Sequence, residues 1–268
     1  MSGPRAARVI GPGALMLTLI ACGGGARVAA PPAPAGTVDL VEYCAAVVAV
    51  ETVEQPSINA DTQEGRLEQL KAFTTGTLRP LVDQLLAVAP PELTRAYAVQ
   101  NAALAKVETT GDFATAFQTA EVQAAVDAAH EYDVANCTWD GADVVGIDYA
   151  FEGVPATFTA GPVTLDFSNA SENGKTHQMT ILRKSEEASS EASFEELLQL
   201  PQKELSQQVT YVAGTFAEPG SDDYIVLSMA PGEYAMVCLI PLDETDENPQ
   251  PTDPSHMTEG MIAEFTVE

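Results

Sequence analysis

The apolar residues of this chain change their spacing near residue 140, and this change limits the fold more than any other feature. Between residues 38 and 137 they recur every three to four positions, as Leu67, Leu70 and Phe73 do, which is typical of amphipathic helices. From Val144 onwards apolar and polar residues alternate, which is typical of half-buried strands. The pattern therefore predicts an α + β chain of two domains, the first helical and the second made of strands.

Cap and turn residues indicate where the helices end. Pro90-Pro91 closes one helix and opens the next, because proline suits a first helical turn. Gly111-Asp112 supplies a stop and a new N-cap. We expect an interruption near Pro80, and a bundle of four or five helices over residues 38–138.

The second half reads as a series of short strands separated by turns. Seven or eight such strands indicate a Greek-key β-sandwich over residues 144–268. The polar and apolar spacing of residues 185–207 predicts a helical excursion between two strands. The clearest strands are expected at residues 147–151, 163–167, 177–183, 209–216, 224–229, 233–239 and 262–267.

The N-terminus has the pattern of an export signal. Arg5 and Arg8 precede an apolar run that is too short to span a bilayer and ends at Ala21-Cys22. Leu19-Ile20-Ala21-Cys22 resembles the lipobox of bacterial lipoproteins, which implies removal of residues 1–21 and lipidation of Cys22. Residues 22–37 are rich in Gly, Ala and Pro and predict a flexible tether. We expect a protein anchored by lipid at the extracytoplasmic face of a membrane.

Four side chains in the second half offer a set of metal ligands. His177 begins a predicted strand, Cys238 ends another, and His256 and Met261 follow a long connecting segment. The chain has only three histidines, and two of them fall in this pattern. A thiolate, two imidazoles and a weak axial thioether are the ligands of a blue-copper electron-transfer site.

The order Cys238, His256, Met261 before a closing strand resembles the last loop of the plastocyanin-like cupredoxins. The spacing from His256 to Met261, with Gly260 just before the methionine, is similar to that of the family. The resemblance covers about residues 144–268. It implies a cupredoxin-like sandwich that binds one copper ion through the four side chains named above and carries one electron at a time.

Two features depart from the family pattern. Residues 239–255 separate Cys238 from His256, where family members have only a few residues. Gln178 follows His177, where many cupredoxins have a small polar residue that tethers the ligand loops. Both departures bear on the rigidity and the redox tuning of the site.

The remaining cysteines, Cys44 and Cys137, bracket the helical region. In an exported protein, two cysteines so placed favour a disulfide over two thiols. Closing so long a loop contributes about 4–5 kcal/mol on the chain-entropy model.

The chain is strongly acidic, with a net charge of −27. This charge argues against nucleic acid and against docking onto anionic lipid, so we expect membrane contact only through the lipid anchor. We expect a redox partner protein, but the acids are spread along the chain, which is typical of a solvated surface and does not identify that partner.

The sequence shows no nucleophile paired with a base and no phosphate-binding loop, so we expect no enzymatic activity. His130 is expected to be a partly exposed helix residue. Two alternatives to electron transfer stay open. Met179, Met236 and Met257 lie near the ligands in sequence and are compatible with copper trafficking, and a sandwich without metal would act as an interaction module.

Overall fold

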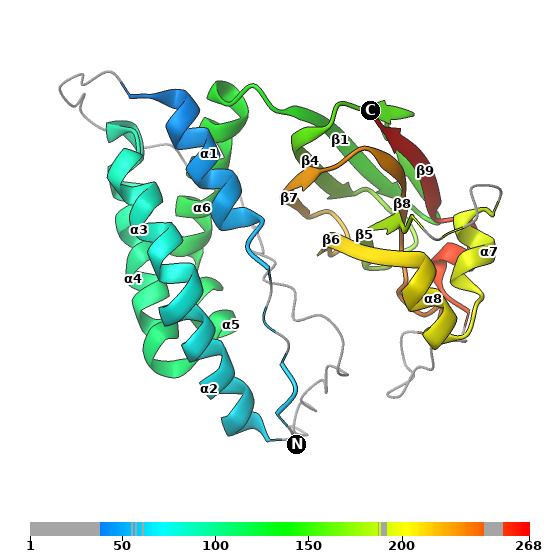
Figure 1. The fold of residues 1–268 in the computed structure, drawn as a ribbon, viewed down its shortest axis with the longest axis horizontal. Coiled ribbons are helices and arrows are strands. Elements are labelled where there is room, and N and C mark those ends of the chain that lie inside the picture. Colours follow the sequence, from blue (N-terminus) through cyan, green and yellow to red (C-terminus); the bar gives the residue numbers. More distant parts are fainter. Residues whose placement is uncertain are drawn as a thin grey trace.

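The computed structural model describes residues 38–54, 56, 58–60, 62–186, 188, 192–243 and 254–268. A group of helices and a pair of β-sheets lie side by side (Figure 1). The predicted signal peptide, Cys22 and the tether lie outside the described residues. Within the described part, no helix is both long and apolar enough to cross a bilayer.

The helical part follows the predicted pattern closely. Gly111 ends one helix in the left-handed conformation, and Asp112 caps the next by accepting a hydrogen bond from the Thr115 amide. The helices are α1 (Leu40–Glu51), α2 (Gln63–Phe73), the π-helix η1 (Thr74–Leu78), α3 (Arg79–Val88), the 3-10 helix η2 (Pro91–Leu93), α4 (Thr94–Thr110), α5 (Phe113–Phe117) and α6 (Ala120–Asn136).

The expected interruption near Pro80 takes a different form. The chain stays helical from α2 through η1 into α3, and the π-helical turn of η1 ends two residues before the proline, which is the second residue of α3. Proline lacks the amide hydrogen that a regular helix needs. The wider turn of η1 lies just before the position where that donor is missing.

A disulfide joins Cys44 on α1 to Cys137 at the end of α6, as predicted. The two cysteines are 93 residues apart, so the bond closes a loop that spans the helical part. Next to it, the buried hydroxyl of Tyr43 pairs with the Tyr97 hydroxyl at 2.8 Å and with Asp133 at 2.5 Å. Covalent and polar contacts therefore hold the first and last helices together.

The second part consists of two mixed β-sheets, ordered β2-β1-β4-β7 and β3-β9-β8-β5-β6. The pairs β1·β4 and β3·β9 are parallel, and the other paired neighbours are antiparallel. The strands are β1 (Asp140–Ile147), β2 (Ala150–Glu152), β3 (Thr157–Phe158), β4 (Gly161–Asn169), β5 (His177–Lys184), β6 (Val209–Ala217), β7 (Asp222–Met229), β8 (Gly232–Val237) and β9 (Ile262–Val267).

Both sheets contribute to one buried core. Leu165 and Phe167 of β4 belong to the same apolar cluster as Ile181 of β5, Met236 of β8 and Phe265 of β9. These side chains come from alternate positions on their strands, which is why the alternating pattern was visible in the sequence. The shared core holds the two sheets together and fixes the strand ends that carry the candidate site.

The predicted strand at residues 147–151 is wrong. The chain reverses there, because Ile147 ends β1 and pairs with Ala150 at the start of β2. Asp148 and Tyr149 form the turn, and Asp148 has a positive φ of 46°. Asp tolerates this conformation better than most residues other than glycine. Every other predicted strand overlaps an observed one, although the strand expected over residues 233–239 ends at Val237.

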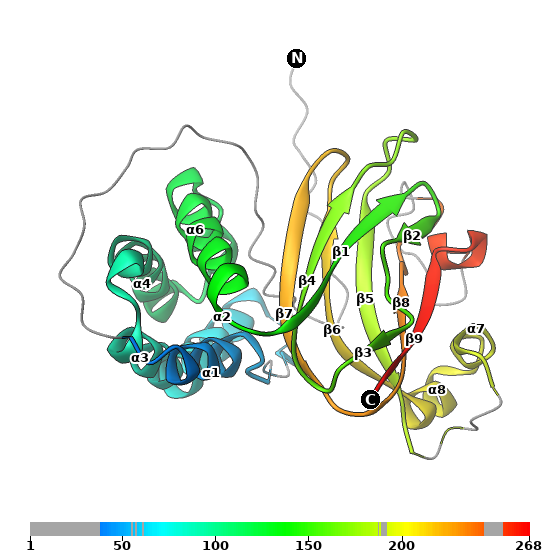
Figure 2. The ribbon, with the colours of Figure 1, turned by 90° about the horizontal axis from the view of Figure 1, so that it is seen from above.

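The helices pack against the sheet that ends in β7, and Figure 2 shows β7 on the side nearest them. His130 of α6 stacks on Tyr224 of β7 at 3.4 Å between ring centroids, and its Nε2 lies 2.5 Å from Asp166 of β4. Two short helices, α7 (Phe194–Leu198) and α8 (Gln202–Gln208), lie on the opposite side and confirm the predicted excursion.

Candidate metal centre

Three strand ends bring the predicted ligands to one edge of the second sheet. His177 begins β5, and Cys238 directly follows β8. Because β5 and β8 are antiparallel, with Thr180 opposite Val237, the start of one lies beside the end of the other. The 3-10 helix η3 (His256–Glu259) and Met261 come just before β9, which pairs with β8 on its other side.

The donor atoms of His177, Cys238 and His256 converge. The two imidazole Nδ1 atoms are 3.1 Å apart, and the Cys238 Sγ lies 3.4 Å from Nδ1 of His256. All three donor atoms lie within 4.8 Å of one another. All three residues are fully buried, and the two histidine rings meet at 71°. The structure thus assembles residues that are up to 79 positions apart in the chain.

The sulfur of Cys238 accepts a hydrogen bond from the backbone amide of Gln178 at 3.3 Å. Gln178 directly follows His177, so the same strand supplies one candidate ligand and a donor to another. An amide donor of this kind stabilises negative charge on sulfur. The residue type at position 178 departs from the cupredoxin pattern, but this hydrogen bond does not depend on it, because the backbone amide makes the bond.

The residues fit a soft, mononuclear metal ion such as copper. Bonds of about 2.0–2.1 Å to imidazole and about 2.3 Å to thiolate, as measured for zinc, allow two donors to be up to about 4 Å apart. The distances of 3.1 Å and 3.4 Å fall within this range. One thiolate and two imidazoles also match the donor types of a trigonal copper site.

Met261 is fully buried, and its backbone hydrogen-bonds to the backbones of two other candidate ligands. Its amide donates to the His256 carbonyl at 3.1 Å, and its own carbonyl accepts from the Cys238 amide at 3.1 Å. Its terminal methyl lies 3.3 Å from where a Cβ on Gly146 would be, so a larger residue there would crowd it. Its role as an axial ligand stays a prediction.

The two described ends of the segment between Cys238 and His256 pair with each other beside the site. The His256 amide donates to Ile240 at 2.9 Å, and the Leu242 amide donates to Pro254 at 2.9 Å. Pro241 and Ser255 form an antiparallel bridge between these two bonds. The ends of the insertion are thus held together.

Sequence reasoning missed two neighbours of the histidines. Ser171 places its hydroxyl oxygen 2.5 Å from Nε2 of His177. Tyr149 meets the His256 ring edge-on, with centroids 5.1 Å apart. Tyr149 belongs to the turn between β1 and β2 of the other sheet, whereas Ser171 belongs to the loop that joins β4 to β5, six residues before His177. The sole signal in the sequence was the polar loop before His177.

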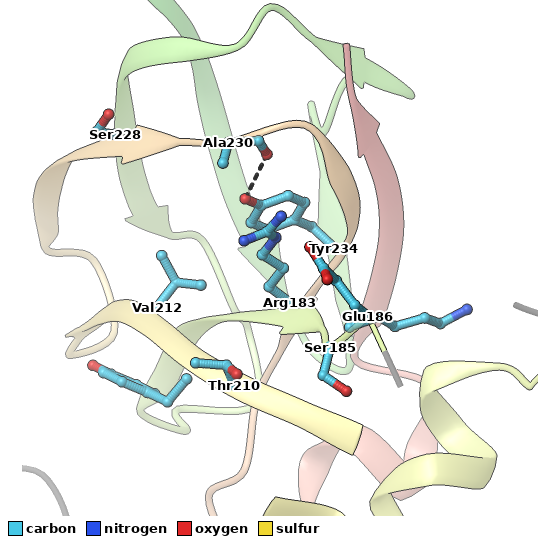
Figure 3. Close-up of a pocket in the computed structure, with 10 residues that line it drawn as sticks. Arg183, Ser185, Glu186, Thr210, Val212, Ser228, Ala230 and Tyr234 are labelled. Atoms are coloured by element: carbon cyan, nitrogen blue, oxygen red, sulfur yellow. Dashed lines mark hydrogen bonds between the residues drawn. The ribbon is translucent and has the colours of Figure 1, made fainter. Parts of the chain in front are cut away.

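An open pocket of about 290 Å³ lies elsewhere, at the far end of β5 (Figure 3). Arg183 reaches over the ring of Tyr234, whose hydroxyl donates to the Ala230 carbonyl at 2.7 Å. Because His177 begins β5 and Arg183 lies near its end, this pocket and the candidate metal centre do not overlap.

No family model and no curated protein matches the sequence. Among solved structures, the cupredoxins auracyanin B, rusticyanin and azurin are similar to about half of the chain. Auracyanin B has 19% identity and a TM-score of 0.30, with 48% of this chain and 88% of that chain covered. Rusticyanin from Thiobacillus ferrooxidans has 18% identity and a TM-score of 0.30, with 49% and 79% covered.

An azurin from Methylomonas sp. strain J has 13% identity and a TM-score of 0.28, with 48% of this chain and 98% of that chain covered. A multicopper oxidase has 11% identity and a TM-score of 0.27, with 48% and 44% covered. The case for a function therefore rests on the geometry of the site and not on these likenesses.

Proposed function

We propose that the protein binds one copper ion through His177, Cys238 and His256, with Met261 as a weak axial ligand, and carries single electrons. The observation that supports this most is the convergence of two Nδ1 atoms and one thiol sulfur within 4.8 Å, all fully buried. When bound, copper supplies a one-electron redox couple at this position.

The chain's own residues suit such a role. Burial of the three ligands excludes water from the site and keeps them in fixed positions. The amide of Gln178 donates to the Cys238 sulfur, and the backbone bonds of Met261 tie it to both Cys238 and His256. A site that holds its ligands in this way needs little rearrangement when the charge of the ion changes.

The proposal extends to the architecture and to the place of the protein. We infer a cupredoxin-like Greek-key sandwich over residues 144–268 and a helical bundle over residues 38–138. We further propose that Cys22 carries the lipid that anchors the protein at the extracytoplasmic face of a membrane. The disulfide between Cys44 and Cys137 is consistent with an oxidising compartment. The proposed partner is a redox protein, and we assign no enzymatic activity.

The burial of the neighbouring methionines favours electron transfer over copper trafficking. Met179 and Met236 are fully buried in the core that the two sheets share, and Met257 is 8% exposed. A site that hands Cu(I) to another protein needs soft ligands that an acceptor can reach. These thioethers instead pack as apolar side chains do.

Addition of Cu(II) to the purified protein tests the proposal. An intense blue charge-transfer band is expected, because a copper–thiolate bond produces it. Cys238→Ser should abolish the band, since a serine oxygen cannot form that bond, whereas the core variant Met236→Leu should keep it. A folded wild type that stays colourless with excess Cu(II) would overturn the electron-transfer function and favour an interaction module without metal.

A further inference from the structure

The hydroxyl group of Ser171 lies beside His177, although Ser171 is not one of the candidate ligands. We propose that Ser171 is a positioning residue for His177. The Ser171 hydroxyl oxygen keeps the imidazole proton on Nε2, so that the lone pair of Nδ1 faces Cys238 and His256. The inference rests on the proposed function, because it treats His177 as a ligand.

The two nitrogens of the His177 ring face different partners. Nδ1 lies 3.1 Å from Nδ1 of His256, on the side of the candidate ligands. Nε2 lies 2.5 Å from the Ser171 oxygen. A neutral imidazole carries one proton, so a ring that offers Nδ1 to a metal must hold its proton on Nε2. Ser171 is placed to accept that proton in a hydrogen bond.

The position of Ser171 is fixed by a second donor to the same oxygen. The backbone amide of Asp148 donates to it at 2.9 Å. An amide can only donate, so one lone pair of the hydroxyl oxygen is occupied by Asp148. The other lone pair is available to Nε2–H of His177. The serine oxygen thus joins the turn between β1 and β2 to the start of β5.

Asn169 holds the backbone on which Ser171 lies. Its side-chain oxygen accepts from the Ser171 amide at 3.0 Å. Its side-chain nitrogen donates to the carbonyls of Lys175 and Ala217, at 2.8 Å and 2.9 Å. Asn169 is only 2% exposed, and it binds the loop before His177 near both of its ends. A hydroxyl on so restrained a loop can fix the orientation of a ring.

The same turn also reaches the second imidazole. Asp148 contacts the Ser171 oxygen, while the next residue, Tyr149, meets the ring of His256 edge-on at 71°. The positive φ of Asp148 belongs to this tight reversal. One turn of the first sheet therefore restrains both candidate imidazole ligands of the second sheet, directly or through Ser171.

The protonation of His177 in the metal-free wild type is the first test. Two-bond ¹⁵N–¹H correlations of the ring distinguish the two tautomers. We expect the proton on Nε2. A wild type with the proton on Nδ1 would overturn the proposal, and this measurement needs no variant to fold.

Variants at position 171 give the second test. Ser171→Ala should mix the two tautomers and weaken copper binding in a competition titration, with a loss of about 10–100-fold as for other partners of ligating histidines. Ser171→Thr keeps the hydroxyl and should restore both properties. Ser221→Ala is the control, because that hydroxyl donates to the Glu218 carbonyl, in the turn between β6 and β7. A folded Ser171→Ala with wild-type tautomer and affinity would overturn the inference.

The two proposals fail in different ways. A wild type that binds no copper rejects the proposed function, while the tautomer of His177 in wild type and Ser171→Ala still decides the role of the serine. A wild type that turns blue together with an unaffected Ser171→Ala rejects only the positioning role.

Discussion

The backbone amide of His256 donates a hydrogen bond to the carbonyl of Ile240 at 2.9 Å, so the two ends of the insertion meet beside the candidate ligands. The amide of Met257 bonds in turn to the Cys238 carbonyl at 2.9 Å. The ligand loop therefore closes through these bonds, whatever the length of the chain beyond them. This explains how a site of this kind tolerates residues 239–255.

Removal of residues 243–253, the part of the insertion beyond its paired ends, should leave copper binding intact. Leu242 and Pro254 are hydrogen-bonded neighbours, so Gly-Gly in place of residues 243–253 can join them. We expect the blue band to remain and the copper affinity, measured by competition titration, to change less than about threefold, a difference below 1 kcal/mol.

His256→Gln in the shortened chain is the matched control and should lose the band. A shortened protein that folds but binds no copper would show that the excised residues support the site.

Met261→Gln should keep copper and lower the reduction potential. An amide oxygen favours Cu(II) over Cu(I) more than a thioether does, and axial ligands tune blue-copper potentials. Each tenfold gain in relative affinity for Cu(II) lowers a one-electron potential by about 59 mV. Reversible voltammetry of both proteins measures the shift.

Met257→Gln is the matched control, because this methionine is also buried and lies four residues earlier. If Met261→Gln leaves spectrum and potential unchanged while Met257→Gln alters them, the axial position belongs to Met257.

The convergence of His177, Cys238 and His256 could be predicted, because these residue types in this order are typical of a shared metal site. Cys238, His256 and Met261 follow one another, and His177 begins a clearly alternating strand. The disulfide between Cys44 and Cys137 could be predicted for a similar reason, since few other cysteines were left to pair. In both cases rare residues reduce the number of alternatives.

The turn at Asp148-Tyr149 could not be predicted, because apolar residues continue to alternate through it. Neither residue is glycine, and the reversal is enforced by pairing between Ile147 and Ala150. The role of Ser171 was hidden for a related reason. Serine is common in loops, and only the folded loop between β4 and β5 shows that this hydroxyl faces Nε2 of His177, six residues later.

Cys22→Ala should release the protein from the membrane or block its processing. The lipid on Cys22 is the proposed anchor, and no helix in the described residues can replace it. Fractionation of cells and the intact mass of the protein measure both effects. Cys238→Ala is the matched control, because it removes another cysteine and should leave the protein anchored. A Cys22→Ala protein that is processed normally and stays with the membrane contradicts the lipidation.

Asp223→Asn should make the protein less sensitive to pH and more stable above neutral pH. Burial raises the pKa of Asp223 from 3.8 to about 7, although hydrogen bonds from Thr215 and from the Tyr224 amide lower it. Between pH 4 and 7 the folded protein thus holds a proton that the unfolded chain has released. Across this window a rise in pH lowers the free energy of unfolding, by about 1.4 kcal/mol for each unit of pKa difference, because only the unfolded chain has released the proton. Above about pH 7 the folded protein loses the proton too, and the decline ends.

Asparagine stays neutral at every pH, so the variant should lose this part of the pH dependence. Urea unfolding at pH 5 and pH 8 measures it, provided that the slope against urea is unchanged. Glu51 and Asp133 also have pKa values raised by burial, to about 7 and about 6, so some dependence should remain. Asp143→Asn changes the same charge at an exposed position of β1 and serves as the control. If Asp223→Asn and wild type lose equal stability between the two pH values, Asp223 does not hold its proton in the folded protein.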